Sequence, residues 1–469
     1  MGFVGIRISN AQADVVKAIV AAGGDPFFVG GIVRDRFMEI IFNISKPAKD
    51  MDIEVFDIDI AEIVAVMKSC DAVQHVDIVG TKFSVITVRC IDGTDMDISS
   101  PRRETKVGMG SSEFDAVADP FMSKQEAASR RDFSMGAIMV RCITGEVFDF
   151  FGGIQSIEDR TIRAVGPRFV ESPDRMVRAG RFAAQFGFAV DAEVVSMCQE
   201  MAQRGEFQTI FAEKMAGEMV KICHSNAPSR AFRFFIDAGF GAFMPEVAAM
   251  IGCKQDVRHH PEGDVFEHTC RVMDEMARVC NDRGIVGDER VIMVMGAICH
   301  DMGKPASTTI HADGAVTSEG HAAAGVAIAR SFMRRMGFCT PAMIQHVCQI
   351  VKHHMDGIGV KPTARIVRRW AVKFAPMTIA QFAMITQADA SGRDTGCFQP
   401  CAAFEAIAVE QNCSNEVPVK IIQGRHCIAA GIKPGVAIGA IIAACFEAQI
   451  DGVFNDHAGG IAFMQSVSI

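Results

Sequence analysis

Residues 27–56 read FFVGGIVRDRFMEIIFNISKPAKDMDIEVF, in which an apolar run, a glycine pair and two acidic residues follow one another. The apolar run at 27–29 predicts a short buried strand. Gly30 and Gly31 follow at once, and the apolar spacing after them is typical of a helix. A strand, a glycine turn and a helix start form a phosphate cradle, because glycines let the backbone approach an anion and free N–H groups at the helix start point at it.

Asp50 and Asp52 stand two residues apart in the alternating segment that ends this stretch. On a strand, residues i and i+2 face the same side, so these carboxylates would repel each other unless a cation lay between them. Oxygen-only ligands of this kind suit Mg²⁺ held jointly with substrate phosphates. The alternative is a surface strand with two solvated aspartates. The order of strand, glycine pair, helix and Asp-x-Asp strand favours the metal site.

This order resembles the catalytic signature of the DNA polymerase beta-like nucleotidyltransferases. Within that superfamily, the run GGIVRD at 30–35 is similar to the form found in tRNA nucleotidyltransferases (CCA-adding enzymes) and bacterial poly(A) polymerases. The resemblance implies that Asp50 and Asp52 are catalytic and hold Mg²⁺. It also implies that four residues of the turn and the helix bind the nucleotide: Gly30, Gly31, Arg34 and Asp35.

Three later segments extend the resemblance. The expected strand at 95–98 carries Asp97, which would be the third catalytic carboxylate. The run SRRDFSMGA at 129–137 is similar to the family segment that binds the incoming nucleotide, and guanidinium groups offer a fork of donors to phosphate oxygens. The run FVESPDRMVR at 169–178 is similar to the Glu-Asp-x-x-Arg element that reads the base edge of CTP or ATP. Nucleotide binding is thereby implied for Arg130, Arg131, Asp132, Glu171, Arg175 and Arg178.

The chain departs from the family pattern at two of these positions. Gly136 stands where the family usually has Asn, and Ser172 stands where the base-reading element has Asp. Serine can donate or accept a hydrogen bond, but it is shorter than aspartate and uncharged. The choice between C and A, and the contacts to the sugar, therefore stay open.

A second chemical centre is expected in the later half of the chain, around a His-Asp doublet at 300–301 inside an apolar helix. Imidazole and carboxylate groups together can hold a divalent metal that activates water on a phosphate. The pattern resembles the HD superfamily of metal-dependent phosphohydrolases, which accompanies the nucleotidyltransferase head in some bacterial relatives. Metal ligation is implied for His268, His300, Asp301 and Asp389, with His321, His353 and His354 as supports. The identity of this metal is left open.

The sequence thus predicts an α+β fold in four parts. A nucleotidyltransferase head with a small mixed sheet would occupy 1–165, a helical neck and RNA-binding region 166–250, an α-helical HD domain 251–400, and a helical tail 401–469. A loop rich in glycine, serine and acidic residues is expected at 103–126 and a buried helix at 436–446.

Composition restricts the class of protein further. The net charge is −9, so a nucleic-acid partner would need a local basic face. The 16 cysteines include no CxxC pair, which favours reduced thiols over a disulfide framework. Arg7 and Asp14 interrupt any N-terminal apolar core, and no apolar stretch is long enough to span a bilayer, so a cytoplasmic protein without membrane contact is expected. The chain contains no leucine and no tyrosine, and its 28 methionines and 34 phenylalanines stand where a core would usually use leucine.

These features together predict a template-independent nucleotidyltransferase that adds C and A to the tRNA 3′ end from CTP and ATP with Mg²⁺. Three alternatives stay open. One is a poly(A) polymerase or an enzyme that adds only A, and another is an HD phosphohydrolase with a degenerate head. The third is an RNA-binding module without activity. The intact Asp-x-Asp argues against a degenerate head, and the oligomeric state is left open.

Overall fold

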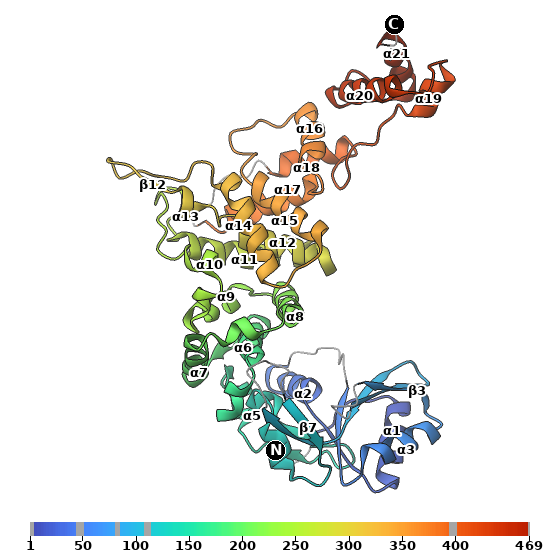
Figure 1. Ribbon diagram of the computed structural model, residues 1–469, viewed down its shortest axis with the longest axis vertical. Helices are drawn as coiled ribbons and strands as arrows, with labels where there is room; N and C mark the ends of the chain where they lie inside the picture. Colours follow the sequence, from blue (N-terminus) through green and yellow to red (C-terminus); the bar gives the residue numbers. More distant parts are fainter. Residues whose placement is uncertain (1–3, 44–50, 80–84, 107–113, 394–400, 468–469) are drawn as a thin grey trace. The chain divides into compact units, whose positions relative to one another are not determined.

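The computed structural model describes residues 4–43, 51–79, 85–106, 114–393 and 401–467 (Figure 1). These residues group into two compact units. The first comprises Met1–Glu218 and Arg230–Phe243, and the second comprises Met219–Ser229 and Met244–Ile469. No helix within the described ranges combines the length and the apolar character that crossing a bilayer requires.

A mixed seven-stranded sheet forms the centre of the first unit, in the order β3-β4-β5-β2-β1-β8-β9. Strands β2 and β5 pair in parallel, whereas the other neighbours pair antiparallel. The sheet and the helices around it confirm the α+β class. The strands are β1 (Asp25–Phe28), β2 (Asp52–Phe56), β3 (Val73–Val79), β4 (Val85–Cys90), β5 (Asp95–Ser99), β8 (Met139–Arg141) and β9 (Val147–Phe148).

Local sequence explains where the main helices of this unit begin. Ser9 caps α1 with its side chain, and Gln12 returns a side-chain bond to complete a capping box. Gly30, at φ +70°, turns the chain from β1 into α2. The helices are α1 (Asn10–Ala21), α2 (Gly31–Phe42), α3 (Ile60–Ser69), α4 (Lys124–Ser129), α5 (Gly153–Glu158), α6 (Asp174–Phe186), α7 (Ala192–Gln203), α8 (Ala212–Cys223) and α9 (Ser229–Asp237), of which α8 runs into the second unit.

Phenylalanine fills the core of the sheet in place of the absent leucine. Phe27 of β1 and Phe56 of β2 are both fully buried, and their rings meet edge to face with centroids 5.4 Å apart. Such aromatic pairs stabilise a core beyond the area that they bury. The two strands that carry the glycine turn and the aspartate are therefore held rigidly together.

The prediction of a loop at 103–126 is wrong for those residues of the range that the structure describes. Strands β6 (Arg102–Lys106) and β7 (Phe114–Ala118) pair antiparallel, and α4 begins at Lys124. Polar residues do not prevent pairing here, because main-chain hydrogen bonds hold the two strands and the half-buried Arg102 and Glu104 pair with each other at 2.6 Å. Arg103 also joins the hairpin to its surroundings through ion pairs with Asp119 and Glu126.

Where the structure describes the second unit, its regular elements are helices apart from one short hairpin. Helix α12 is buried along almost its whole length and packs against α11, α15 and α17. The elements are α10 (Pro245–Ala248), α11 (Val265–Asp282), α12 (Gly287–Cys299), α13 (Lys304–Ser307), β12 (Thr309–Ile310), β13 (Val316–Thr317), α14 (His321–Arg335), α15 (Pro341–His353), α16 (Ala364–Phe374), α17 (Ile379–Ser391), α18 (Cys401–Glu410), α19 (Gly424–Ala429), α20 (Val436–Asp451) and α21 (His457–Val467).

The helix expected at 436–446 is present as the start of α20, but it is not a buried helix. Val436 is 94% exposed, and only Cys445, Ala448 and Ile450 of α20 are buried. The tail helices α19, α20 and α21 share a small core that covers one side of α20. An all-round apolar sequence therefore did not indicate burial here.

Two candidate active sites

The first candidate site lies at the glycine turn between β1 and α2. A Cβ atom at Gly30 would lie 3.2 Å from Asp52 Oδ2 and 3.5 Å from Arg131 Nη1. The absence of a side chain therefore keeps the space between a carboxylate and a guanidinium open. Helix α2 begins at Gly31, so the free N–H groups of its first turn lie at the helix end that adjoins this space.

The predicted acidic residues are brought together by strand register. Asp52 of β2 and Asp97 of β5 are direct partners in the parallel pair, so their side chains are neighbours on one face. Thr87 of β4 donates its hydroxyl hydrogen to Asp97 Oδ1 at 2.6 Å and fixes that carboxylate. Asp50 lies outside the described residues. Neighbouring carboxylates with oxygen-only donors fit a divalent cation such as Mg²⁺.

The two predicted arginines follow α4 and meet a glutamate that the sequence analysis did not single out. Arg130 donates to Glu54 Oε1, and Arg131 Nη2 lies 3.8 Å from Glu54 Oε2. Glu54 is fully buried on β2, two residues after Asp52. Burial lowers the pKa of Arg131, and Glu54 partly offsets this effect. The spacing of two residues between Asp52 and Glu54, which puts both on one face of β2, was the signal that could have identified Glu54.

Side chains of helix α6 also contact the segment that carries Arg130 and Asp132. Arg178 Nε donates to Asp132 Oδ2 at 2.6 Å, and Arg175 donates to the main-chain oxygens of Arg168 and Arg130 at 2.6 and 2.9 Å. Burial favours the neutral acid at Asp132, but the charge and hydrogen bond of Arg178 outweigh it and lower the pKa of Asp132. The structure thus joins Asp132, Arg175 and Arg178 in one network.

The remaining predicted residues of this site make contacts of their own. Arg34 Nη2 lies 2.7 Å from Asp35 Oδ1, and its guanidinium lies over the rings of Phe182 and Phe186 at 5.3 and 4.7 Å. Glu171 pairs with Arg168 at 3.1 Å. The Arg34 contacts tie the first turn of α2 to α6, whereas the Glu171–Arg168 pair lies within the segment that precedes α6.

Ser172, at the departure from the family pattern, is buried, and its hydroxyl donates to Asp174 Oδ1 at the start of α6. Asp174 is a residue that the sequence analysis did not single out. Its carboxylate lies next to the position where the family has an acid.

The second candidate site gathers the four predicted ligands from three elements: His268 on α11, His300 and Asp301 at the end of α12, and Asp389 on α17. All four are buried. His268 Nε2 lies 3.0 Å from Asp389 Oδ1 and 3.7 Å from Asp301 Oδ2, while His300 Nε2 lies 3.2 Å from Asp301 Oδ2. Sequence positions up to 121 residues apart are thus brought within ligand distance of one another.

Two of the three expected supporting histidines belong to this cluster. His321 Nε2 and His354 Nε2 are 3.2 Å apart and lie 3.3 and 3.7 Å from Asp301 Oδ1. His353 was expected with them but is turned away, because its Nδ1 contacts Asp356 at 2.9 Å and its ring packs against Phe374. Of the two consecutive histidines at the end of α15, only His354 therefore faces the cluster.

Hydrogen bonding to the outer ring nitrogens tests whether this cluster fits a metal. The Nδ1 atoms face main-chain carbonyl oxygens at 2.7 Å for His300, 2.7 Å for His321 and 2.8 Å for His354. A carbonyl oxygen only accepts, so each ring carries its proton on Nδ1 and directs an Nε2 lone pair inward. Inward lone pairs beside carboxylates repel unless a cation lies among them, and this is the usual arrangement of metal-bound histidines. The donor set therefore fits a divalent metal.

Glu262 is a supporting residue that was not singled out from the sequence. Its Oε1 lies 2.8 Å from Nδ1 of His268 and 2.8 Å from Nδ1 of His260. Burial raises the pKa of this carboxyl group, but the hydrogen bonds of the two histidines and of the backbone prevail and lower it to about 2. For Asp301, burial favours the neutral acid, yet His300 and Lys304 hold the pKa well below its ordinary value.

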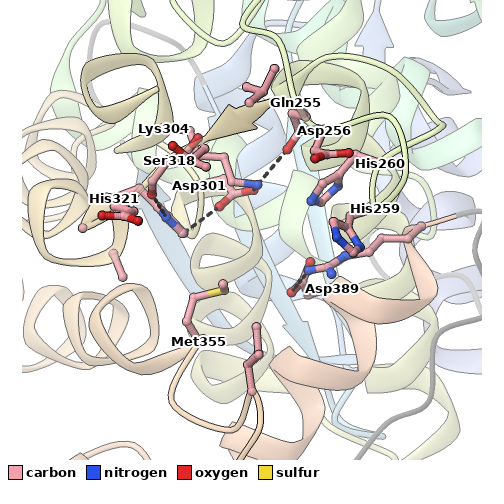
Figure 2. Close-up of a pocket in the computed structure, with 17 residues that line it drawn as sticks. Gln255, Asp256, His259, His260, Asp301, Lys304, Ser318, His321, Met355 and Asp389 are labelled. Atoms are coloured by element: carbon pink, nitrogen blue, oxygen red, sulfur yellow. Dashed lines mark hydrogen bonds and ion pairs between the residues drawn. The ribbon is translucent and has the colours of Figure 1, made fainter. Parts of the chain in front are cut away.

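A cavity of about 570 Å³ opens onto this cluster (Figure 2). Asp301 and His321 line it, and Lys304 Nζ lies 2.7 Å from both Asp301 Oδ2 and Gln255 Oε1. His259 and Arg393 also contribute to its wall. A cavity with a cluster of metal-binding groups on one side and cations on the wall can take an anionic, phosphate-bearing ligand.

Comparison with protein families matches both sites. Residues 26–163 match the model of the Poly A polymerase head domain, and residues 265–378 match the model of the HD domain. The first match contains the glycine turn and the predicted carboxylates, and the second contains the His-Asp doublet. Both matches imply dependence on divalent metal ions.

Curated relatives cover most of the chain. A multifunctional CCA protein of Stenotrophomonas maltophilia (strain K279a) is 30% identical over 377 residues, which are 78% of this chain and 86% of that protein. A multifunctional CCA protein of Xanthomonas euvesicatoria pv. vesicatoria (strain 85-10) is 31% identical over 375 residues, 78% of this chain and 85% of that protein.

Solved structures share the fold at lower identity. A CCA-adding enzyme in an apo form gives a TM-score of 0.67 with 17% identity over 100% of both chains. The Bacillus stearothermophilus CCA-adding enzyme in complex with CTP gives 0.64 with 18% identity over 98% of both chains. The Thermotoga maritima CCA-adding enzyme complexed with tRNA gives 0.60 with 15% identity over 100% of both chains.

Proposed function

This chain belongs to the family of multifunctional CCA proteins, and from that premise we propose that it adds C and A to the 3′ end of tRNA, using CTP and ATP with Mg²⁺. The observation that carries the proposal is the open space at Gly30, which has Asp52 on one side and Arg131 on the other. A nucleotide triphosphate needs a cation site and a cationic side chain next to a backbone that can approach it closely. Such substrates belong to the cytoplasm, where we place the protein.

Each group of residues in the first site would have its own role in phosphoryl transfer. Asp50, Asp52 and Asp97 would hold Mg²⁺, which supplies charge neutralisation and lowers the pKa of the attacking 3′-hydroxyl. Arg131 and the N–H groups at the start of α2 would orient the phosphates, since a guanidinium offers paired donors. Asp132, held by Arg178, would accept a hydrogen bond from the sugar.

The residues before and within α6 would select the base of the incoming nucleotide. Glu171 and Arg175 match the base-reading element, and Ser172 would contribute a hydroxyl in place of a carboxylate. The tRNA itself would be held by the helical region at 166–250, through phosphate contacts that do not depend on sequence. Poly(A) addition or addition of A alone is the second candidate, because the same nucleotide site would serve it.

We also propose a metal-dependent phosphohydrolase activity in the HD domain. Its support is the inward-facing set of imidazole Nε2 atoms and carboxylates around Asp301, next to the cavity that Lys304 lines. His268, His300, Asp301 and Asp389 would hold a divalent metal, which activates water for attack on a phosphate ester.

One assay tests the transferase. The protein is incubated with tRNA that lacks its 3′-terminal CCA, with Mg²⁺ and with each nucleoside triphosphate singly and together, and the added residues are read by sequencing. We expect two C residues and then one A, and no addition by Asp52→Asn. Long A tracts would favour the poly(A) alternative, and no incorporation by the unaltered protein would refute the transferase.

A further inference from the structure

Glu54 is a buried carboxylate that none of the proposed steps uses. It lies on β2 between Asp52 and Phe56, and the alternation of a strand places these three side chains on the same face. Its exposed fraction is 0%. A buried charge is unfavourable unless it is paired, and a glutamate at this depth calls for a specific partner.

The two oxygens of Glu54 have different surroundings. Oε1 accepts a hydrogen bond from Arg130, whereas Oε2 is buried and has no hydrogen bond within the described part of the chain. The cation near Oε2 is Arg131, at 3.8 Å, which is an ion-pair distance but too long for a hydrogen bond. One arginine is therefore bonded to Glu54, and the other is attracted to it by charge.

Other contacts reinforce this difference between the two arginines. Arg130 Nη1 lies 3.6 Å from Glu104, and the main-chain oxygen of Arg130 accepts from Arg175 at 2.9 Å. Arg131 instead directs Nη1 toward Gly30, within 3.5 Å of the position that a Cβ would take there. Arg130 is thus anchored from several sides, while Arg131 reaches into the open space at the glycine turn.

We propose that Glu54 is a positioning residue for nucleotide transfer, an inference that rests on the proposed transferase function. It fixes Arg130 by hydrogen bonding and holds Arg131 opposite Gly30 by charge alone. The hydrogen-bond donors of Arg131 then remain directed at the phosphates of the incoming nucleotide. An apolar residue in the same place would pack without an unbonded oxygen but would leave two adjacent guanidinium groups to repel each other.

Glu54→Gln separates positioning from packing, because glutamine keeps the shape and an oxygen for Arg130 but loses the charge. Arg131 is then displaced by its neighbour, and a shift of about 1 Å at a reacting group can cost about 100-fold in rate. The positive charge near the phosphates does not fall, so ground-state binding is retained. We expect kcat to fall at least about tenfold while the KM for CTP and for ATP changes less than about threefold.

Glu206→Gln is the matched control. Glu206 is also buried in the first unit, its Oε1 lies 2.6 Å from Arg204 Nε, and its Oε2 is buried without a hydrogen bond in the described structure. Both variants lose a buried carboxylate from an arginine pair, and both Tm values are measured. At saturating tRNA, where tRNA affinity does not enter the rate, we expect kcat and the KM for CTP and ATP of Glu206→Gln to equal those of the unaltered protein. Glu54→Asp, which restores the charge, should recover part of the lost kcat.

The outcomes distinguish the inference from its premise. If the unaltered protein adds no nucleotide, the proposed function itself fails. If it does add nucleotides and Glu54→Gln has the same kcat per folded molecule, or raises only KM, the positioning role is wrong. Should Glu54→Gln not fold, Arg130→Lys tests the same pair, since lysine keeps the charge but cannot make a forked contact. An unchanged kcat in that variant would overturn the inference.

Discussion

At the scale of single residues, the third carboxylate of the first site depends on one hydroxyl. Thr87 donates to Asp97 Oδ1 at 2.6 Å, and Thr87→Val would keep the shape of the side chain and remove the donor. A hydrogen bond to a charged group contributes about 1.5–3 kcal/mol, so we expect kcat for nucleotide addition to fall roughly 10- to 100-fold. Steady-state rates with CTP and ATP measure this loss.

The chain offers a matched control on the same sheet. Thr94 donates to Asp92 at 2.6 Å, but Asp92 is exposed, Thr94 is half-buried, and both lie in the connection between β4 and β5. Thr94→Val should therefore leave kcat unchanged. An equal loss in the two variants would mean that the sheet tolerates neither change, and that the Thr87 bond has no special role in catalysis.

Ser172 carries a second prediction at this scale. A base-reading site discriminates because a mismatched base leaves buried polar groups unpaired, and a charged acceptor makes the stronger bond. Cytosine and adenine present an amino group at the edge where uracil and guanine carry a carbonyl. We expect Ser172→Asp to raise the preference for CTP over UTP, measured as a ratio of single-turnover rates, by about tenfold, on a scale of roughly 1–3 kcal/mol per contact.

Ser172→Thr keeps the hydroxyl and should leave the ratio as it is. If the unaltered protein already rejects UTP as strictly as Ser172→Asp does, then another group reads the base. Asp174, which accepts the hydroxyl of Ser172, is the nearest such group.

Some of these residues could be identified from the sequence and others could not, for physical reasons. Asp52 follows from strand alternation, which is a local rule, whereas Asp97 was implied by the family resemblance; the register of the parallel pair makes the two residues neighbours. Glu54 is within the same stretch, but its burial depends on Arg130, whose sequence position is 76 residues away. A propensity or a motif carries no information on such a partner.

At the scale of elements, one glycine permits the close approach that builds the second site. A Cβ at Gly303 would lie 2.0 Å from the main-chain oxygen of His321 and 2.7 Å from the nitrogen of Gly325 on α14. Gly303→Ala must push α14 away, and overpacking of this kind costs about 1–3 kcal/mol. We expect a lower Tm together with a loss of bound divalent metal, because His321 moves with α14.

Gly217→Ala is the comparison variant, since nothing lies within 4 Å of a Cβ at that helical position. Alanine there should be neutral or should stabilise the protein by up to about 1 kcal/mol. A Gly303→Ala protein that is as stable as Gly217→Ala and still binds metal would show that α14 tolerates a wider separation.

The elements themselves were predictable where periodicity is strong. Helices around the His-Asp doublet and the strands of the sheet follow their apolar spacing. The hairpin β6–β7 was missed because polar composition is only correlated with loops, and α20 was taken as buried because its apolar residues run all round the helix. Which side of such a helix is covered depends on its partners, here α19 and α21.

At the scale of the whole molecule, the two candidate centres lie in different compact units, each with its own core. The order of these parts along the chain was predictable because each has a local motif. The four-part division at 165, 250 and 400 remains a prediction, since the contacts group the described residues into two units only.

Separate centres should fail separately. His300 and Asp301 are buried at the end of α12, and His300→Asn with Asp301→Asn removes two inward-facing donors at similar volume. We expect this double variant to lose its divalent metal and its hydrolysis of a generic phosphodiester, because the remaining donors cannot complete the set. Nucleotide addition should stay within about twofold of the unaltered protein.

Asp52→Asn should show the reverse pattern, with metal content in the HD domain and hydrolysis retained. Metal content, hydrolysis and nucleotide addition are measured on the same preparations. A comparable loss of both activities in the double variant would mean that the HD cluster supports the fold of the whole chain rather than a separate reaction.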